Sequence, residues 1–376
     1  MIFFDNASTT KPYPQIARIV EKYNMESFYN PSAVYGTAFS LQNEIKQAKK
    51  DILGCLGAKN TDNFIFTSCA TESNNMILRA FAKKSGKILV SAGEHACVYN
   101  TALDLKNMGF AVEFIKITPD GRVDENDLMT KLTDDVNFVS IIHVNNETGV
   151  VNDIKRLAHI VKLKNKRILF HSDGVQAFGK IPVNVSDLGV DFYTISGHKV
   201  HAPKGIAGLF IAGDKYVKPL LAGGGQQDGF RSGTENVSGI MAFDFACKEI
   251  TKNQKANNQL VKTYYDYMVE NLDKTLPIKI VGKGEKSPYI TMITCDGCRA
   301  ETLVHMLEDN GILVGNGSAC SSKKKDNRNL REMGYSDREI EGAIRISFSE
   351  FNTLDEVKTL VEKLNESVKE YLQKVR

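Results

Sequence analysis

The segment His171-Ser-Asp-Gly-Val-Gln176 decides the fold, because it ends the apolar run that begins at Arg167 and then turns polar. That run has the length and composition of a buried strand. Similar apolar runs occupy residues 64–67, 87–91, 111–115 and 137–143, and helical patterns begin near Thr71, His95, Asp124 and Asp153. Strands that alternate with helices indicate a mostly parallel sheet covered on both faces. The sequence therefore predicts a large α/β domain.

Two further patterns lie outside this alternation. Residues 38–57 repeat apolar side chains, from Phe39 to Leu56, at the spacing of an amphipathic helix that ends at Gly57. Beyond about residue 250 the sequence predicts a polar helix to residue 274, strands at 278–281 and 289–294, a helix at 300–310 and a last helix from Thr353. We therefore expect a large domain of residues 13–250 and a smaller α+β domain of residues 1–12 and 251–376.

Composition excludes several classes of protein. With 376 residues, 42% of them hydrophobic and 25% charged, the chain has ordinary globular values and enough length for two or three domains. No apolar run approaches the roughly 18 residues of a membrane-spanning helix, and no secretory signal precedes Asp5, so we expect no membrane association. The net charge of +3 is too small to predict direct binding of nucleic acid by the whole surface.

The cysteines indicate a reducing compartment. Their number is odd and they are scattered, at positions 55, 69, 97, 247, 295, 298 and 320. This pattern argues against a disulfide framework and favours a cytoplasmic protein. The close pair Cys295 and Cys298 lacks the second pair that a zinc site needs, so we expect a structural turn there and no metal.

Polar residues after the strands are the candidates for a site, because ligands of parallel sheets bind beyond the carboxyl ends of the strands. Asp173 and Lys199 follow two such ends. Taken alone, Asp173 could cap a helix and Lys199 could be a solvated surface lysine. Together they supply two groups that pyridoxal 5'-phosphate requires, an amine for a Schiff base and an acid for the pyridinium nitrogen. A carboxylate beside that nitrogen favours its protonated form.

A phosphate site is predicted where the strand at 64–67 turns into the next helix. The turn passes through Cys69, Ala70 and Thr71, which are small residues. The free backbone N–H groups and the dipole at a helix N-terminus attract a phosphate dianion. This segment therefore complements Asp173 and Lys199.

Nine segments follow one another along nearly the whole chain in the order typical of one family. They are Phe4–Thr10, Tyr29–Ser32, Phe66–Asn75, Glu94–His95, Val144–Gly149, Ser196–Lys199, Arg231–Thr234, Gly317–Cys320 and Ile344–Ser347. On these segments the chain resembles the cysteine desulfurases of the NifS/IscS type. The resemblance implies an α/β fold of the aspartate-aminotransferase-like, pyridoxal-phosphate-dependent transferase class. Cys69 departs from the pattern, since relatives usually have glycine there.

The resemblance also implies a role for each matching residue. Lys199 would hold pyridoxal 5'-phosphate as a Schiff base, Asp173 would pair with its ring nitrogen, and Gln176 would bond its ring hydroxyl. The other cofactor contacts implied are Ala70, Thr71, Ser196 and His198 at the phosphate, His95 stacked on the ring, Asn146, and Thr234 at the phosphate of a neighbouring subunit. Arg345 and Asn146 would bind the carboxylate of the substrate.

Two of these residues have a plainer alternative. His95 could be a histidine of the core, but its place directly after a strand in the Glu-His pattern favours a role in proton transfer. Arg345 could form a surface ion pair. It alternates with apolar residues on a predicted strand at 343–347, however, and a buried arginine there needs an anion. The carboxylate of a substrate is the natural candidate.

Cys320 is the predicted nucleophile. It lies among small and polar residues that have little to pack, so we expect a mobile loop. A thiolate is intrinsically nucleophilic, and the nearby Lys323 to Lys325 would favour the anion. Cys320 would attack the sulfur of L-cysteine, keep it as a persulfide and release L-alanine.

The predicted function is therefore that of a cysteine desulfurase acting as a homodimer and delivering sulfur to an acceptor protein. That acceptor would be an iron–sulfur scaffold or an enzyme that thiolates tRNA or a thio-cofactor. Three alternatives stay open: a selenocysteine lyase, another aminotransferase-fold enzyme that uses pyridoxal phosphate, and a catalytically silent scaffold subunit. The last would be expected to lack Lys199 or Cys320, and both are present.

Overall fold

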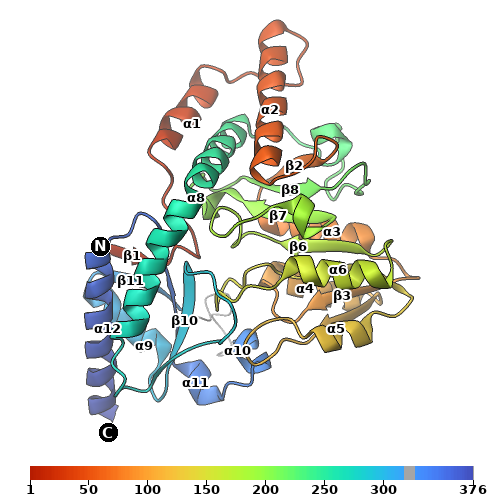
Figure 1. Cartoon of the computed structure of the whole chain (residues 1–376). Coiled ribbons are helices and arrows are strands. Elements are labelled where there is room, and N and C mark those ends of the chain that lie inside the picture. Colours follow the sequence, from red (N-terminus) through yellow and green to blue (C-terminus); the bar gives the residue numbers. More distant parts are fainter. Residues whose placement is uncertain (317–326, 376) are drawn as a thin grey trace.

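The structure is a computed structural model and describes residues 1–316 and 327–375. Figure 1 shows two lobes, each built on one sheet, with α1 (Gln15–Met25) and α2 (Gly36–Cys55) projecting from the larger one. No helix in the described part of the chain is long and apolar enough to cross a membrane.

The larger lobe contains the predicted parallel sheet. Its seven strands run in the order β2 (Asn63–Thr67), β8 (Ala207–Ile211), β7 (Phe192–Ser196), β6 (Leu169–Asp173), β5 (Val136–Ser140), β3 (Lys87–Ser91) and β4 (Ala111–Ile115). Strand β8 is antiparallel to both of its neighbours, and every other pair is parallel. The predicted α/β alternation is therefore confirmed, with one antiparallel strand that the sequence did not indicate.

Helices connect these strands where the sequence predicts them. They are α3 (Ala70–Phe81), α4 (Ala96–Asn107), α5 (Glu125–Lys131) and α6 (Ile154–Lys164), whereas the short α7 (Val185–Leu188) was not predicted. Asp124 and Asp153 cap α5 and α6, because their carboxylates accept hydrogen bonds from backbone N–H groups of the first turn. The predicted helix at 38–57 is α2, although Phe39, placed on its apolar face, is 61% exposed.

Two strands of the larger sheet end at other residues than predicted. The run predicted to end at His143 gives β5, which ends at Ser140, although the N–H groups of Ile141 and His143 still donate to the carbonyls of His171 and Asp173, and the run predicted to end at His171 continues to Asp173. The cause of the second difference is pairing, since Asp173 lies opposite Thr194 in the ladder between β6 and β7. Asp173 is therefore the last residue of its strand, where the sheet itself fixes its backbone.

The smaller lobe has a five-stranded sheet in the order β1 (Ile2–Phe4), β11 (Ile312–Asn316), β12 (Ala343–Ser347), β10 (Ile290–Cys295) and β9 (Ile278–Ile280). Its helices are α9 (Ala300–Asp309), α10 (Arg328–Glu332), α11 (Asp337–Glu341) and α12 (Leu354–Val375). The predicted turn after β10 is confirmed, because the N–H of Cys298 donates to the carbonyl of Cys295 at 3.0 Å.

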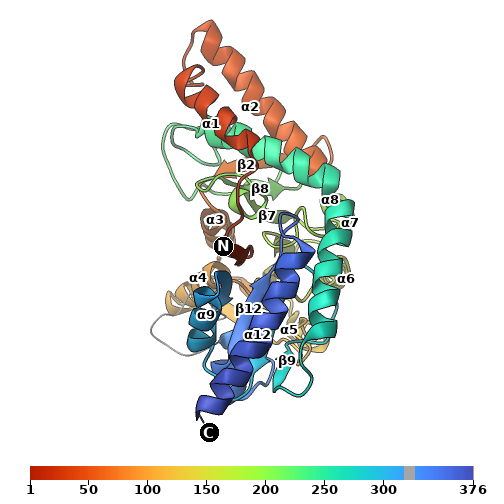
Figure 2. The ribbon, with the colours of Figure 1, turned by 90° about the vertical axis from the view of Figure 1, so that its left-hand side faces the viewer.

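The long helix α8 (Val237–Asn271) joins the two lobes. It packs on α1 and α2 at one end and on α12 at the other, and Figure 2 shows it running beside α12. Residue 250 lies within this unbroken helix. The division into residues 13–250 and residues 1–12 with 251–376 therefore stays a prediction, although β1 does pair with β11 of the smaller lobe.

Candidate active site

A cavity of about 370 Å³ lies at the carboxyl ends of β6 and β7, between the two lobes. Its lining includes most of the residues that the sequence singles out. They are Ala70, Thr71, His95, Asn146, Asp173, Gln176, Ser196, His198, Lys199 and Arg345. The remaining lining residues are Ala7, Ser8, Cys69, Cys97, Ile142 and Val175. The fold thus brings together groups from segments far apart in the sequence.

Lys199 enters this cavity from the short 3-10 turn Gly197–Lys199, which follows β7 directly. Its Nζ donates hydrogen bonds to the carbonyl oxygens of Ala7 and Ser8, both at 2.6 Å. The N-terminal segment therefore forms the wall opposite the amine. Its place in the cavity excludes the alternative of a solvated surface lysine.

Asp173 is buried at the base of the cavity. Its Oδ2 accepts a hydrogen bond from Asn74 Nδ2 at 2.8 Å, and its Oδ1 accepts one from the backbone N–H of Val175 at 3.0 Å. Burial nevertheless raises the pKa of Asp173, because these neutral donors and the nearby His95 and Lys199 only partly offset the loss of water. A cation bound against this carboxylate would compensate for the lost water and favour the ionised form of Asp173.

His95 is the N-cap residue of α4, and its Nδ1 faces Cys97, two residues further along the chain. Nδ1 accepts the backbone N–H of Cys97 at 3.2 Å and lies 3.0 Å from Cys97 Sγ. These contacts favour the tautomer that carries the proton on Nε2. Burial lowers the pKa of His95, so the ring is neutral at neutral pH and able to accept a proton.

The end of the cavity at α3 suits an anion. Ala70 and Thr71 form the first turn of that helix, where backbone N–H groups have no helical partners. Ser196 and His198 line the same cavity, and His198 Nδ1 lies 3.2 Å from Thr9 Oγ1. Burial and the nearby Lys199 lower the pKa of His198 to about 4, so this histidine would act as a neutral hydrogen-bond partner.

Arg345 lies on β12 with its guanidinium at the mouth between the lobes. It donates to Asp5 Oδ1 at 2.8 Å, to Ser8 Oγ at 2.5 Å and to the carbonyl of Asn146 at 2.9 Å. The sequence predicted that a buried arginine here needs an anion and offered the substrate for it. The structure shows that Asp5 already supplies one, so Arg345 is held in place before any substrate binds.

One predicted residue does not line this cavity, and another cannot be placed relative to it because it lies outside the described part of the chain. Thr234 is exposed and does not line it, as expected for a residue that would act on a neighbouring subunit. Cys320, the predicted nucleophile, lies outside the described residues.

The two chain segments that flank residues 317–326 both reach the site. Before the gap, Gly315 of β11 pairs with Arg345 in the sheet. After it, Arg328 donates to the carbonyl oxygens of Ala92, at 3.1 Å, and of Glu94, next to His95, while its guanidinium lies 3.6 Å from the centre of the Tyr99 ring. The described residues on either side of 317–326 thus lie beside the cavity.

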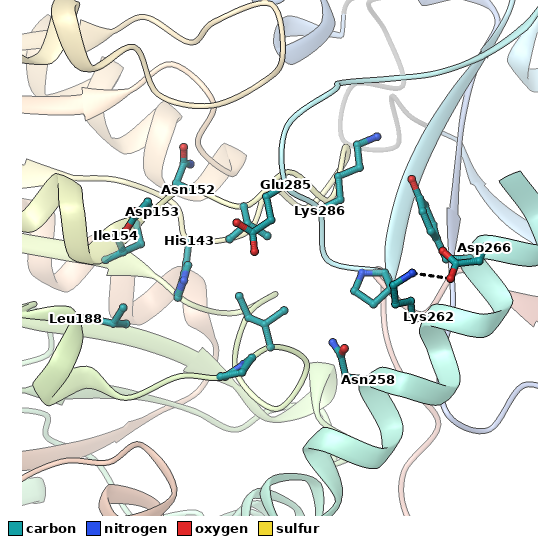
Figure 3. Close-up of a pocket in the computed structure, with 15 residues that line it drawn as sticks. His143, Asn152, Asp153, Ile154, Leu188, Asn258, Lys262, Asp266, Glu285 and Lys286 are labelled. Atoms are coloured by element: carbon teal, nitrogen blue, oxygen red, sulfur yellow. Dashed lines mark hydrogen bonds and ion pairs between the residues drawn. The ribbon is translucent and has the colours of Figure 1, made fainter.

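A second cavity of about 510 Å³ lies elsewhere between the lobes (Figure 3). His143 and Asp153 approach it from the larger lobe, and Lys262 and Asp266, which pair at 2.5 Å, approach it from α8. It is more spacious than the first cavity, and its lining also has an imidazole, carboxylates and amines, but it has no guanidinium and includes neither Asp173, nor Lys199, nor the first turn of α3. The smaller cavity is therefore the candidate active site.

The lining of that cavity fits pyridoxal 5'-phosphate. The pKa of the buried Asp173 carboxyl is raised for lack of a full counter-charge, and a protonated ring nitrogen would supply that charge. Lys199 provides an amine, and the first turn of α3 provides donors for a phosphate.

Sequence reasoning missed several residues that shape this site. Ala7 and Ser8 act through their carbonyl oxygens, Asp5 through its pair with Arg345, and Asn74 and Cys97 through contacts behind Asp173 and His95. Asp5 to Ser8 and Asn74 do lie within segments quoted for the resemblance. Their place within those segments was the available signal.

Comparison with known proteins identifies the family of this chain. The sequence profile of the family described as "Aminotransferase class-V" matches residues 2–360. A "NifS/IcsS protein homolog" of Lactobacillus delbrueckii subsp. bulgaricus is 37% identical, over 97% of this chain and 97% of its own length. "Cysteine desulfurase IscS 1" of Archaeoglobus fulgidus is 33% identical, over 97% of this chain and 96% of its own.

Solved structures give the same result. A NifS-like protein from Rickettsia africae superposes with a TM-score of 0.90 at 32% identity, covering 98% of this chain and 99% of that one. A structure described as "SspA in complex with cysteine" superposes with a TM-score of 0.82 at 26% identity, covering 94% and 100%. These matches confirm the predicted aminotransferase-like fold and the resemblance to the NifS/IscS group, and the chain belongs to the class-V aminotransferase family.

Proposed function

We propose that this protein is a pyridoxal-phosphate-dependent cysteine desulfurase that converts L-cysteine to L-alanine and keeps the sulfur as a persulfide on Cys320. The observation that carries the proposal is the single cavity that joins Lys199, Asp173, His95 and Arg345. The names of the relatives and the cysteine bound to one structural neighbour support it.

Each side chain has a task in this proposal. Lys199 holds the cofactor covalently, Asp173 keeps its ring nitrogen protonated, and Gln176 bonds its ring hydroxyl. Ala70, Thr71, Ser196 and His198 hold its phosphate. When bound, the cofactor supplies an electron sink for the α-carbon of the substrate. His95, neutral because of its burial, stacks on the ring and moves a proton at its Nε2.

Arg345 and Asn146 select an amino acid by its carboxylate. The guanidinium of Arg345 is fixed by Asp5 and by the carbonyl of Asn146, so little freedom is lost when a carboxylate binds. A planar guanidinium can donate two parallel hydrogen bonds to that group.

Cys320 receives the sulfur. Its thiolate attacks the sulfur of the substrate, an S–S bond forms and the C–S bond breaks. The electron pair of the broken bond remains with the substrate carbon, which takes up a proton to become the methyl group of alanine. The flanking contacts of Gly315 and Arg328 beside the cavity support this assignment.

The proposal includes a homodimer and a protein acceptor of sulfur in the cytoplasm. Large apolar side chains stand exposed on the projecting α1 and α2 region of Figure 1, at Met25, Phe28, Val34, Tyr35 and Phe39. Several large apolar side chains exposed in one region are typical of a protein interface. In the dimer, Thr234 would reach the cofactor phosphate of the neighbouring subunit.

One assay tests the proposal against its alternatives. With pyridoxal phosphate, L-cysteine and dithiothreitol, we expect a yellow protein that releases sulfide and alanine in equal amounts without any keto acid. Alanine formed only when a keto acid is added would instead identify an aminotransferase. Faster turnover of selenocysteine than of cysteine would identify a selenocysteine lyase, and no product from either would leave a silent scaffold.

Replacing Arg345 with lysine is expected to raise KM for L-cysteine about 10- to 100-fold, because a charged hydrogen-bond pair is lost that contributes about 1.5–3 kcal/mol. The matched control is Arg338→Lys, which alters an exposed arginine paired with Asp296 on the far part of the smaller lobe. Steady-state kinetics of both variants check the prediction. An unchanged KM in Arg345→Lys would remove Arg345 from the substrate site.

A further inference from the structure

Lys180 is a buried lysine to which the proposed function assigns no role. Only 4% of its surface is exposed, at the end of the turn that follows β6. Its carbonyl accepts hydrogen bonds from Gln254, at 3.2 Å, and Asn258, at 2.8 Å, so α8 fixes its backbone. Burying an ammonium group is costly, and lysines are almost never this buried without a partner.

The partner of Lys180 is a residue of the candidate site. Its Nζ donates to Gln176 Oε1 at 2.5 Å, while Gln176 Nε2 donates to the carbonyl of Ala7 at 2.9 Å. That carbonyl also accepts a hydrogen bond from Lys199 Nζ at 2.6 Å. The two amines are therefore linked through one amide and one carbonyl.

The direction of these hydrogen bonds is fixed by chemistry. While it is protonated, the amine of Lys180 has donors and no acceptor, so in that state Gln176 turns its oxygen toward Lys180. The NH₂ group of Gln176 then faces the N-terminal wall and the cavity, with one of its two hydrogens used by Ala7. The second hydrogen remains for an acceptor in the cavity.

The charges around Lys180 come from several elements. The positive charges of Lys199, in the 3-10 turn, and Arg345, on β12, disfavour the protonated form of Lys180. The negative charge of Glu350, in the loop after β12, favours it. Burial is the largest effect, and the pKa of Lys180 falls to about 7. In turn, Lys180 is one of the charges that depress the pKa of His198. Lys180 and the site therefore influence each other electrostatically.

We propose that Lys180 is a positioning residue that orients Gln176 toward the ring hydroxyl of the cofactor, and that its positive charge favours the unprotonated form of the nitrogen joining Lys199 to the cofactor. The proposal rests on the cofactor assignment made above. Two effects of the Lys180 cation both favour the unprotonated form of this nitrogen. A cation hydrogen-bonded to Gln176 Oε1 strengthens the N–H donors of the same amide, and like charges disfavour a second proton nearby.

The test is a titration of the visible absorption band of the loaded protein, recorded without substrate, in Lys180→Met and Lys180→Gln. Methionine removes both the charge and the donor. Glutamine removes the charge and keeps a donor for Gln176 Oε1, so this variant is expected to fold. The matched control is Lys204→Met, because Lys204 also acts on His198 but is exposed, where water screens its charge.

Both Lys180 variants are expected to raise the apparent pKa of the visible band by about one unit, whereas the control should move it by a few tenths at most. Thermal unfolding shows which variants are folded. A shift in folded Lys180→Gln no larger than that of the control would overturn the proposal. A wild-type protein without a visible band would instead refute the cofactor assignment, so the two failures are distinguishable.

Discussion

Replacing Lys199 with alanine is expected to lower sulfide release by about a thousandfold or more, because a covalent anchor and a proton carrier are lost together. The amine of Lys199 lies in the candidate site and donates to Ala7 and Ser8. Alanine cannot form the covalent link to the cofactor. The measurement is the rate of sulfide release at saturating cysteine, with pyridoxal phosphate in excess.

A readout that does not depend on turnover accompanies this prediction. After reduction with borohydride, the wild-type protein should carry the cofactor permanently on the peptide that contains Lys199, and the variant should not. Lys204→Ala is the matched control, because it removes an exposed lysine only a few residues away. Permanent attachment of the cofactor to another lysine in Lys199→Ala would contradict the assignment.

The larger sheet could be predicted because its strands and helices have distinct periods. Runs such as residues 87–91 have a continuous apolar centre, here Ile88 to Val90, as expected for strands buried on both faces, and the helices between them begin at capping residues such as Asp124. The direction of β8 could not be predicted. Its apolar sequence would suit either direction, and only its pairing with β2 and β7 makes it antiparallel.

The first half of α8 was not predicted, because its sequence lacks the pattern of an amphipathic helix. Residues from Val237 to Ile250 are buried on several sides, so they lack the alternation of apolar and polar faces that marks an amphipathic helix. The second half has a polar face and was predicted. Periodicity therefore indicates helices at a surface better than helices inside the molecule.

The residues of the candidate site likewise divide into those that the sequence predicts and those that it does not. Asp173 and Lys199 were predicted because each follows a strand, and the ends of parallel strands meet at one edge of a sheet. Asp5 was not connected with Arg345, since 340 residues separate them and only the sheet formed by β1, β11 and β12 brings them together. Ala7 and Ser8 were not predicted either, because a carbonyl oxygen carries no signature of its residue type.

Cys320 was predicted as the nucleophile from the composition of its surroundings. The raised pKa values of most other thiols in the chain support that prediction. Burial raises the pKa of Cys97 to about 12 and that of Cys298 to about 11, and it also raises the pKa of Cys55, Cys247 and Cys295. Thiols held in this way are poor nucleophiles, since the thiolate is the reactive form. Among the described residues, Cys69 is the one exposed thiol, and it lines the candidate site.

Cys69 and Cys320 are therefore the two candidates for the nucleophile, and one pair of variants decides between them. Cys320→Ser is expected to lose sulfide release by about a hundredfold or more, because serine keeps the size of the side chain and removes its soft nucleophile. The same variant should still change its visible spectrum when cysteine is added, since the residues that bind cofactor and substrate are intact. Cys69→Ser is the matched control and should keep most of the activity. The reverse result, loss in Cys69→Ser and retention in Cys320→Ser, would place the persulfide at the first turn of α3, and the contacts of Gly315 and Arg328 would then have no part in sulfur transfer.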